Sequence, residues 1–129
     1  MQYINYFKIL AQVVIALSIY NVWFFRFNKS TKYRGKDAAN MKQEFISYGL
    51  PASFVWVIGF LKVSFATMLV VGIFFPVLNI VFPAACGMAF LMLCAIAMHL
   101  KVKDAPVKSL PATIFLVLSL LIAFLEYYP

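Results

Sequence analysis

Three polar side chains within the apolar part of the sequence are of types that bind oxygen-rich groups. Lys62 lies about nine residues inside an apolar run, roughly 13 Å deep at the rise of an α-helix. His99 ends a second run, and Asn21 lies near the end of a third. An ammonium, an imidazole and an amide can together hold a phosphate, another anion or a quinone oxygen. If their helices are adjacent, we expect Asn21, Lys62 and His99 to form one ligand-binding cluster.

Each of these residues also has an ordinary structural interpretation, and the sequence leaves both interpretations open. Lys62 can extend its amine toward the head groups and help to set helix packing. His99 can satisfy a carbonyl group at a helix end, and Asn21 can form a hydrogen bond between helices. Gly59 and Ala66 share a helical face with Lys62. That pattern favours a lysine directed into a bundle rather than toward lipid.

Reacting groups of the common enzyme classes are missing from the sequence. It contains no pair of intramembrane carboxylates, glycine-rich phosphate loop, nucleophile elbow or CxxC motif. Its single histidine has no partner at metal-ligand spacing. We therefore expect no catalytic residue, no metal site and no tightly bound cofactor. A quinone or a phospholipid is the kind of molecule that the polar cluster suits.

Long apolar runs must position these side chains. They cover residues 7–25, 53–75, 79–100 and 110–127, each near the ~20 residues that cross a bilayer as a helix. The chain is 65% hydrophobic, and the runs do not alternate as barrel strands would. The fold class predicted is an all-α integral membrane protein. Residues 1–129 would form a single transmembrane domain, a four-helix bundle.

The connection between the first two spans has a helical pattern of its own. Apolar side chains recur at helical spacing, namely Ala38, Met41, Phe45 and Tyr48. Asp37 is a plausible N-cap, and Gly49 and Pro51 provide a stop signal. The pattern predicts a short amphipathic helix over residues 37–48, with its aromatic side in the head-group boundary. An ordinary ordered loop is the alternative.

The net charge of +7 is concentrated in two loops that share one side of the predicted bundle. The positive-inside rule places those loops in the cytoplasm and both termini outside. Basic residues beside membrane spans favour membrane lipids over nucleic acid as the partner. Glu126 is expected at the opposite membrane surface, too far away to neutralise Lys62. The residues expected to contact lipid head groups are Arg26, Lys29, Lys32, Arg34, Lys36, Lys101 and Lys103.

The order of these features resembles that of the DoxX-like family of small bacterial membrane proteins. The similarity covers roughly residues 10–125, and its motifs are FISYGLP at 45–51, GFLKV at 59–63 and HLK at 99–101. The resemblance implies a four-helix membrane fold. Founding members are described as the membrane subunit of a thiosulfate:quinone oxidoreductase, and some relatives as partners of redox-protective enzymes. His99 matches the family, whereas many relatives have a glutamate at the position of Lys62.

The resemblance and the missing catalytic groups together indicate a non-catalytic subunit or accessory factor. Its complex would be a quinone-linked redox or respiratory assembly of the bacterial inner membrane. Its partner there would be another membrane protein or a second copy of the chain. The alternative is a small lipid- or anion-binding protein, or a transporter, with a cytoplasm-facing polar cavity around Lys62.

Overall fold

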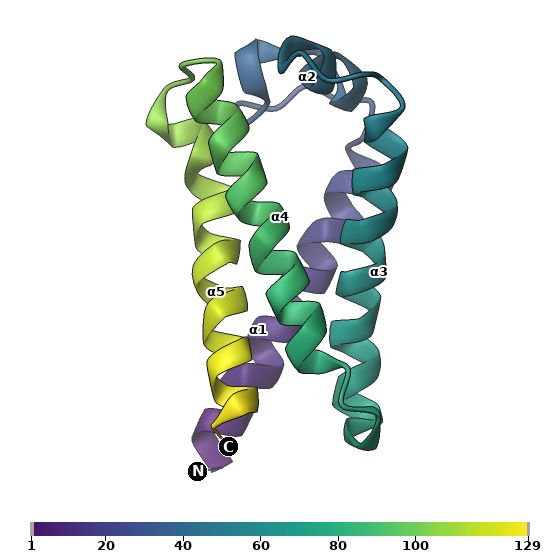
Figure 1. Cartoon of the computed structure of the whole chain (residues 1–129), viewed down its shortest axis with the longest axis vertical. Helices are drawn as coiled ribbons and strands as arrows, with labels where there is room; N and C mark the ends of the chain where they lie inside the picture. The colour runs from purple at the N-terminus through teal and green to yellow at the C-terminus, as the bar shows by residue number, and fades with distance from the viewer. Residues whose placement is uncertain (1, 129) are drawn as a thin grey trace.

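The regular elements of the computed structural model, which describes residues 2–128, are all helices (Figure 1). Four of them are long and apolar enough to cross a membrane. This confirms the predicted helical membrane bundle, with boundaries close to those expected. The four are α1 (Gln2–Tyr20), which continues into a π-helical turn, η1 (Asn21–Phe25), followed by α3 (Phe54–Phe74), α4 (Val81–Lys101) and α5 (Leu110–Tyr127).

The four long helices form a ring in which each packs against its two neighbours. The packed pairs are α1–α3, α3–α4, α4–α5 and α5–α1. Both termini lie at one end of the bundle, and the short helix α2 (Met41–Ser47) lies across the other (Figure 1). We call this second end the basic end. It carries α2, η2 (Gly35–Asp37), η4 (Pro106–Ser109) and the loops around them, whereas η3 (Pro76–Leu78) joins α3 and α4 at the opposite end.

Small residues allow α3 and α4 to approach closely. Ala84 and Ala85 of α4 are fully buried, and Gly72 of α3 lies against the side chain of Val81. Gly87 lies against the ring of Phe65, where an added Cβ would meet the ring atoms. In lipid, close packing of this kind takes the place of the hydrophobic effect as the force that holds helices together.

The helix α2 begins later than the sequence pattern indicated. Asn40, rather than Asp37, is its N-cap, because the Asn40 side chain accepts a hydrogen bond from the Gln43 N–H at 2.9 Å. Asp37 lies in η2 with a φ of 54° and forms an ion pair with Lys108 instead. The prediction of Asp37 as N-cap was therefore wrong, whereas the existence of a short helix in this loop is confirmed.

The apolar face of α2 points into the protein. Met41, Phe45 and Tyr48 are all buried, and the ring of Phe45 lies edge-on to that of Trp23 with centroids 6.3 Å apart. The expectation that this aromatic side lies in the head-group boundary was wrong. The bundle is open enough at the basic end to accept these side chains, so α2 covers the helices and buries its apolar face there.

Candidate ligand-binding cavity

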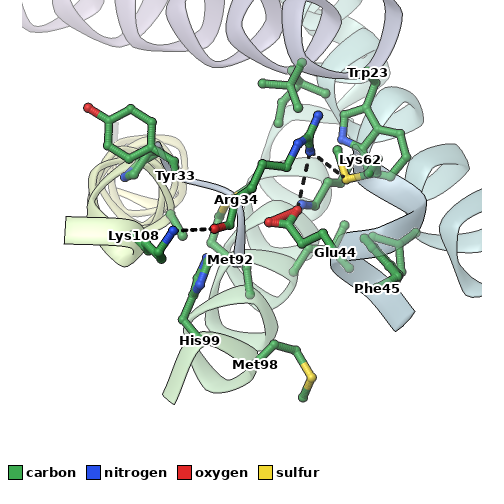
Figure 2. A pocket seen from close by; sticks show the side chains of 18 of the residues that line it. Trp23, Tyr33, Arg34, Glu44, Phe45, Lys62, Met92, Met98, His99 and Lys108 are labelled. Atoms are coloured by element: carbon green, nitrogen blue, oxygen red, sulfur yellow. Dashed lines mark hydrogen bonds and ion pairs between the residues drawn. The ribbon is translucent and has the colours of Figure 1, made fainter. Parts of the chain in front are cut away.

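A cavity of about 900 Å³ lies in the half of the bundle nearest the basic end. Asn21, Lys62 and His99 all line it, although they come from η1, α3 and α4. The structure thus brings the three residues of the predicted cluster to one cavity. Figure 2 shows Lys62 and His99 with other side chains that line this cavity. Most of the wall is apolar, with contributions from Trp23, Phe45 and Met92.

The Lys62 ammonium group lies against an aromatic ring at the cavity. Its Nζ lies over the ring of Trp23, 5.8 Å from the ring centroid. Among residues 2–128 it forms no hydrogen bond and no ion pair. The carboxylate that acts on it electrostatically is that of Glu44, which Arg34 already engages. An ammonium carries three donors, so Lys62 can donate to a ligand that enters the cavity.

His99 is oriented by a carboxylate from the next loop. Its Nδ1 lies 2.8 Å from Oδ2 of Asp104, and both side chains are buried. Oδ1 of Asp104 also accepts the Lys36 N–H at 3.0 Å. Burial by itself raises the pKa of Asp104, but the hydrogen bonds from His99 and Lys36 and the charges of His99 and Lys108 outweigh it and hold that pKa below its ordinary value. One ring nitrogen of His99 is therefore engaged within the protein.

Asn21 opens the π-helical turn of the first span. Its carbonyl oxygen accepts the Arg26 N–H at 3.0 Å, the five-residue spacing of a π-helix. Its side chain is exposed and lines the cavity. Among the described residues its amide forms no hydrogen bond to a neighbouring helix, so it too can donate to a ligand.

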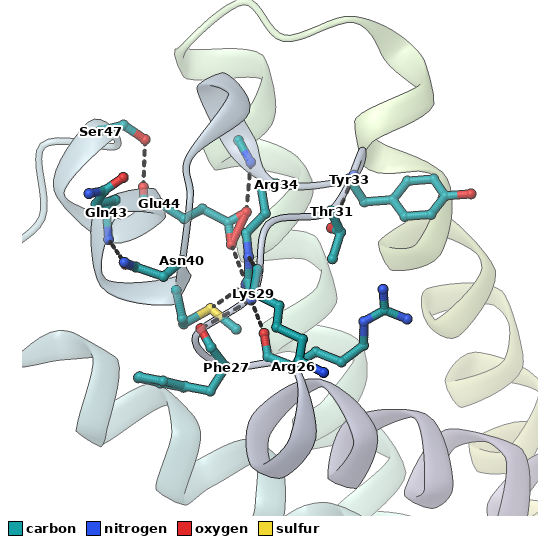
Figure 3. Close-up of polar contacts among 12 residues, drawn as sticks. Arg26, Phe27, Lys29, Thr31, Tyr33, Arg34, Asn40, Gln43, Glu44 and Ser47 are labelled. Carbon is teal, nitrogen blue, oxygen red and sulfur yellow. Dashed lines mark hydrogen bonds and ion pairs between the residues drawn. The ribbon is translucent and has the colours of Figure 1, made fainter.

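Arg34 is buried inside the protein, which corrects its expected place at lipid head groups. The residue is 4% exposed. Its Nη2 donates to the Arg26 carbonyl at 2.6 Å, its Nε donates to the Lys29 carbonyl at 3.1 Å, and its Nη1 lies 3.4 Å from Oε1 of Glu44 (Figure 3). Protein groups therefore occupy the guanidinium donors of Arg34 that a head group would need.

Glu44 joins Arg34 to the backbone beside it. Its Oε2 accepts the Gly35 N–H at 2.7 Å while Oε1 faces the guanidinium of Arg34. The nearby phenol of Tyr48 lies against Gly35, where a Cβ would meet the ring. Burial, followed by the charge of Glu44, raises the pKa of Tyr48 above its ordinary value, so this phenol stays neutral at physiological pH.

The segment of residues 26–40, which we call the strap, forms the wall of the cavity at the basic end. Thr31, Lys32 and Tyr33 of the strap line the cavity. Lys108, from the loop between α4 and α5, ties the strap down by donating to the Arg34 carbonyl at 2.7 Å and to Oδ1 of Asp37 at 2.8 Å. Charged groups therefore attach the strap to α2, through the Arg34–Glu44 ion pair, and to η4, through Lys108.

The other basic residues expected at head groups are exposed at the basic end. Lys101 is among them, and its Nζ also donates to the Tyr48 carbonyl at 2.8 Å. Their contact with lipid stays a prediction. The remaining members of this exposed set are Arg26, Lys29, Lys32, Lys36 and Lys103.

The partners that sequence reasoning missed are the acidic residues and Trp23. The chain has only four acidic residues, and each forms an ion pair: Asp37 with Lys108, Glu44 with Arg34, Asp104 with His99 and Glu126 with Lys8. Their scarcity among eleven basic residues was a usable signal that each would be paired. For Trp23, the available signal was Gly59, one turn before Lys62, which leaves room for a large ring.

Among residues 2–128, no three histidine, cysteine, aspartate or glutamate side chains gather where they could hold a metal ion.

Comparisons with known proteins support the fold. Neither the curated proteins nor the solved structures include a match to this sequence. The sequence profile of the DoxX-like family matches residues 8–122, nearly the whole length of the chain. On this match the protein belongs to the DoxX-like family.

Proposed function

We propose that this protein binds an amphipathic molecule of the membrane in the cavity at Lys62. The observation that carries the proposal is an ammonium group that forms no hydrogen bond or ion pair with the described part of the chain and faces a cavity of about 900 Å³ whose walls are mostly apolar. An unpaired charge at this depth is costly, and such charges in membrane proteins commonly serve a ligand. A ligand whose head group accepts hydrogen bonds would offset that cost.

The cavity suits a head group rich in oxygen atoms joined to an apolar tail. Lys62, Asn21 and the ring of His99 supply polar contacts, and Trp23 and Phe45 supply apolar wall. A phospholipid phosphate and a quinone carbonyl share the acceptor chemistry that an ammonium group recognises. Both molecules dissolve in the bilayer, and both carry tails that match the apolar lining.

The accessory-subunit role expected from the sequence is the second proposal. Membership of the DoxX-like family supports it, and a cavity suited to a quinone is compatible with a place in a quinone-linked redox complex. On this proposal the protein lies in a bacterial inner membrane with its basic end in the cytoplasm. A reaction would then take place on a partner protein, while this chain holds the quinone.

The test is native mass spectrometry of the protein extracted gently from its own membrane. The wild type is compared with Lys62→Met, and bound molecules are identified after solvent extraction. Lys42→Met is the matched control, because Lys42 also lies over a tryptophan ring, that of Trp56, at 5.5 Å but outside the cavity. We expect Lys62→Met to carry at most about a tenth of the amphiphile that the wild type binds. We expect Lys42→Met to carry the same amount as the wild type.

Each outcome of this experiment bears on one proposal. Recovered phospholipid or recovered quinone would identify the source of the head group. A second protein that leaves the membrane with this chain would support the accessory role. Equal amounts of amphiphile in Lys62→Met and the wild type, or none in the wild type, would overturn the binding proposal.

A further inference from the structure

A second hollow, of about 820 Å³, lies between α3 and the segment formed by η1 and the first residues of the strap. We call it the lateral groove. Trp23 lines both the groove and the cavity. The rest of the groove is lined by aromatic side chains together with the polar side chains of Asn28, Ser64 and Thr67. Its lining includes Phe24, Phe27, Trp56, Gly59, Phe60 and Val63.

One side chain therefore stands between the groove and the cavity. The indole ring of Trp23 rests on Gly59, where a Cβ would lie 2.6 Å from a ring carbon. The Lys62 ammonium lies over the same ring. Trp23 belongs to η1, and single π-helical turns within helices occur frequently at functional sites.

The two boundaries of the cavity are held in different ways. At the basic end, Arg34 and Lys108 fasten the strap with hydrogen bonds to backbone carbonyls and with ion pairs to Glu44 and Asp37. On the lateral side, the Trp23 ring is held by aromatic contacts with Phe27 and Phe45 and by the Lys62 charge. Among the described residues the Trp23 indole forms no hydrogen bond, so the lateral boundary lacks the charge-assisted hydrogen bonds that fasten the strap, and we expect it to open more readily.

We propose that Trp23 is a side gate through which an amphiphile passes from the bilayer to Lys62. When the ring leaves Gly59, the lateral groove and the cavity join. The head group then reaches Lys62 while the tail stays among the aromatic side chains of the groove. The ligand class is a membrane-borne amphiphile rather than an anion dissolved in water. This inference rests on the proposed binding function and adds the route and the gating residue.

The gate predicts how fast a bound molecule exchanges with the bilayer. Protein in lipid nanodiscs, loaded with its own amphiphile, is mixed with vesicles that contain the isotope-labelled molecule, and native mass spectrometry follows the replacement. We expect Trp23→Ala to exchange at least tenfold faster than the wild type. Phe90→Ala, a matched loss of an exposed aromatic ring on α4 that lines neither the cavity nor the groove, should exchange at the wild-type rate. Glycerol phosphate, which has no tail, should not displace the bound molecule.

Failure of the gate and failure of the binding function give different results. A wild type that holds no amphiphile would contradict the binding function itself. If the amphiphile stays bound but exchanges equally fast in Trp23→Ala and in the wild type, the gate alone is overturned. Displacement of the bound amphiphile by glycerol phosphate would also overturn the gate.

A fluorescence measurement tests the gate without altering Trp23. In Trp56→Phe, Trp23 is the remaining tryptophan of the chain. Brominated acyl chains should quench its emission, because the Trp23 ring lies at the lateral groove, where the proposed route meets the bilayer. Aqueous iodide should quench the emission less strongly than brominated chains do, because the strap covers part of the cavity at the basic end. Quenching by iodide without quenching by brominated chains would refute lateral access.

Discussion

Lys62 and Arg34 line the same cavity, but their charges are balanced differently. The guanidinium of Arg34 is surrounded by backbone carbonyls and the Glu44 carboxylate, so its donors serve the protein. Within residues 2–128, the ammonium of Lys62 lies over the face of an aromatic ring and forms no hydrogen bond or ion pair. At the scale of single residues, this contrast separates a structural cation from the one that we propose to bind a ligand.

Removal of the Glu44 charge should destabilise the protein, because it leaves Arg34 buried without its carboxylate. We expect Glu44→Gln to lower the free energy of unfolding by about 2 kcal/mol, the cost of losing a buried charged hydrogen bond. Thermal unfolding in mild detergent measures the change.

Glu126→Gln is the control for the loss of a carboxylate. Glu126 pairs with Lys8 near the other end of the bundle, where both side chains are partly exposed. Its loss should cost less than about 1 kcal/mol, as for ion pairs near a surface. Equal melting temperatures for Glu44→Gln and Glu126→Gln would contradict the structural role of Glu44.

The lowered pKa of Asp104 predicts a specific loss of stability in acid. A carboxylate with a lowered folded pKa stabilises the fold fully above its ordinary pKa of 3.8, and the contribution disappears as the pH falls below 3.8 through the folded value. Asp104→Asn should therefore melt at a lower temperature than the wild type at pH 7. The difference should shrink below pH 3.8, as thermal unfolding between pH 7 and pH 3 would show. A difference that stays constant over that range would count against the His99–Asp104 contact.

At the scale of elements, small residues set how closely the spanning helices pack. Ala85 of α4 is completely buried, whereas its neighbour Cys86 is exposed. The two positions are adjacent, carry small side chains and lie on different faces of α4, so they form a matched pair for a packing test.

A larger side chain at position 85 should force the helices apart. We expect Ala85→Leu to destabilise the fold by about 1–3 kcal/mol, the usual cost of overpacking a dense interior. Cys86→Leu should leave stability nearly unchanged, because its side chain points out of the bundle. Thermal unfolding in detergent, followed as the fraction of protein that remains folded, compares the two variants. Equal destabilisation by both changes would show that α4 is rotated from the position described.

At the scale of the whole molecule, the charge distribution predicts the orientation in the membrane. The two loops at the basic end hold most of the positive charge of the chain, so they should remain on the cytoplasmic side. Single cysteines in a Cys86→Ala, Cys94→Ala background can test this. Ser30→Cys reports the basic end and Asn5→Cys the other end, and both positions are exposed.

A membrane-impermeant maleimide should label these cysteines from opposite sides. In intact cells or spheroplasts we expect it to label Asn5→Cys and to spare Ser30→Cys, and in inverted vesicles we expect the reverse. Labelling of Ser30→Cys from outside would reverse the proposed topology and would place the strap on the outer surface.

The spans and the charge asymmetry follow from the sequence alone. Each span is a continuous apolar run, and in hydrocarbon such a run must satisfy its backbone as a helix whatever its neighbours are. The sites at Asn21, Lys62 and His99 were also predictable as a group, because helix length fixes the depth of each residue and all three fall in the same half of the bundle.

Tertiary structure alone decided which groups pair and where the wall of the cavity lies. Arg34 lies in a basic loop that favours lipid contact by composition, yet the fold brings Glu44 and three backbone carbonyls around it. Trp23 meets Gly59 across 36 positions of sequence, a contact that no local periodicity encodes. Local hydrophobicity determines a helix in lipid, but side-chain partners depend on how helices rotate and pack against one another, and this depends on the whole bundle at once.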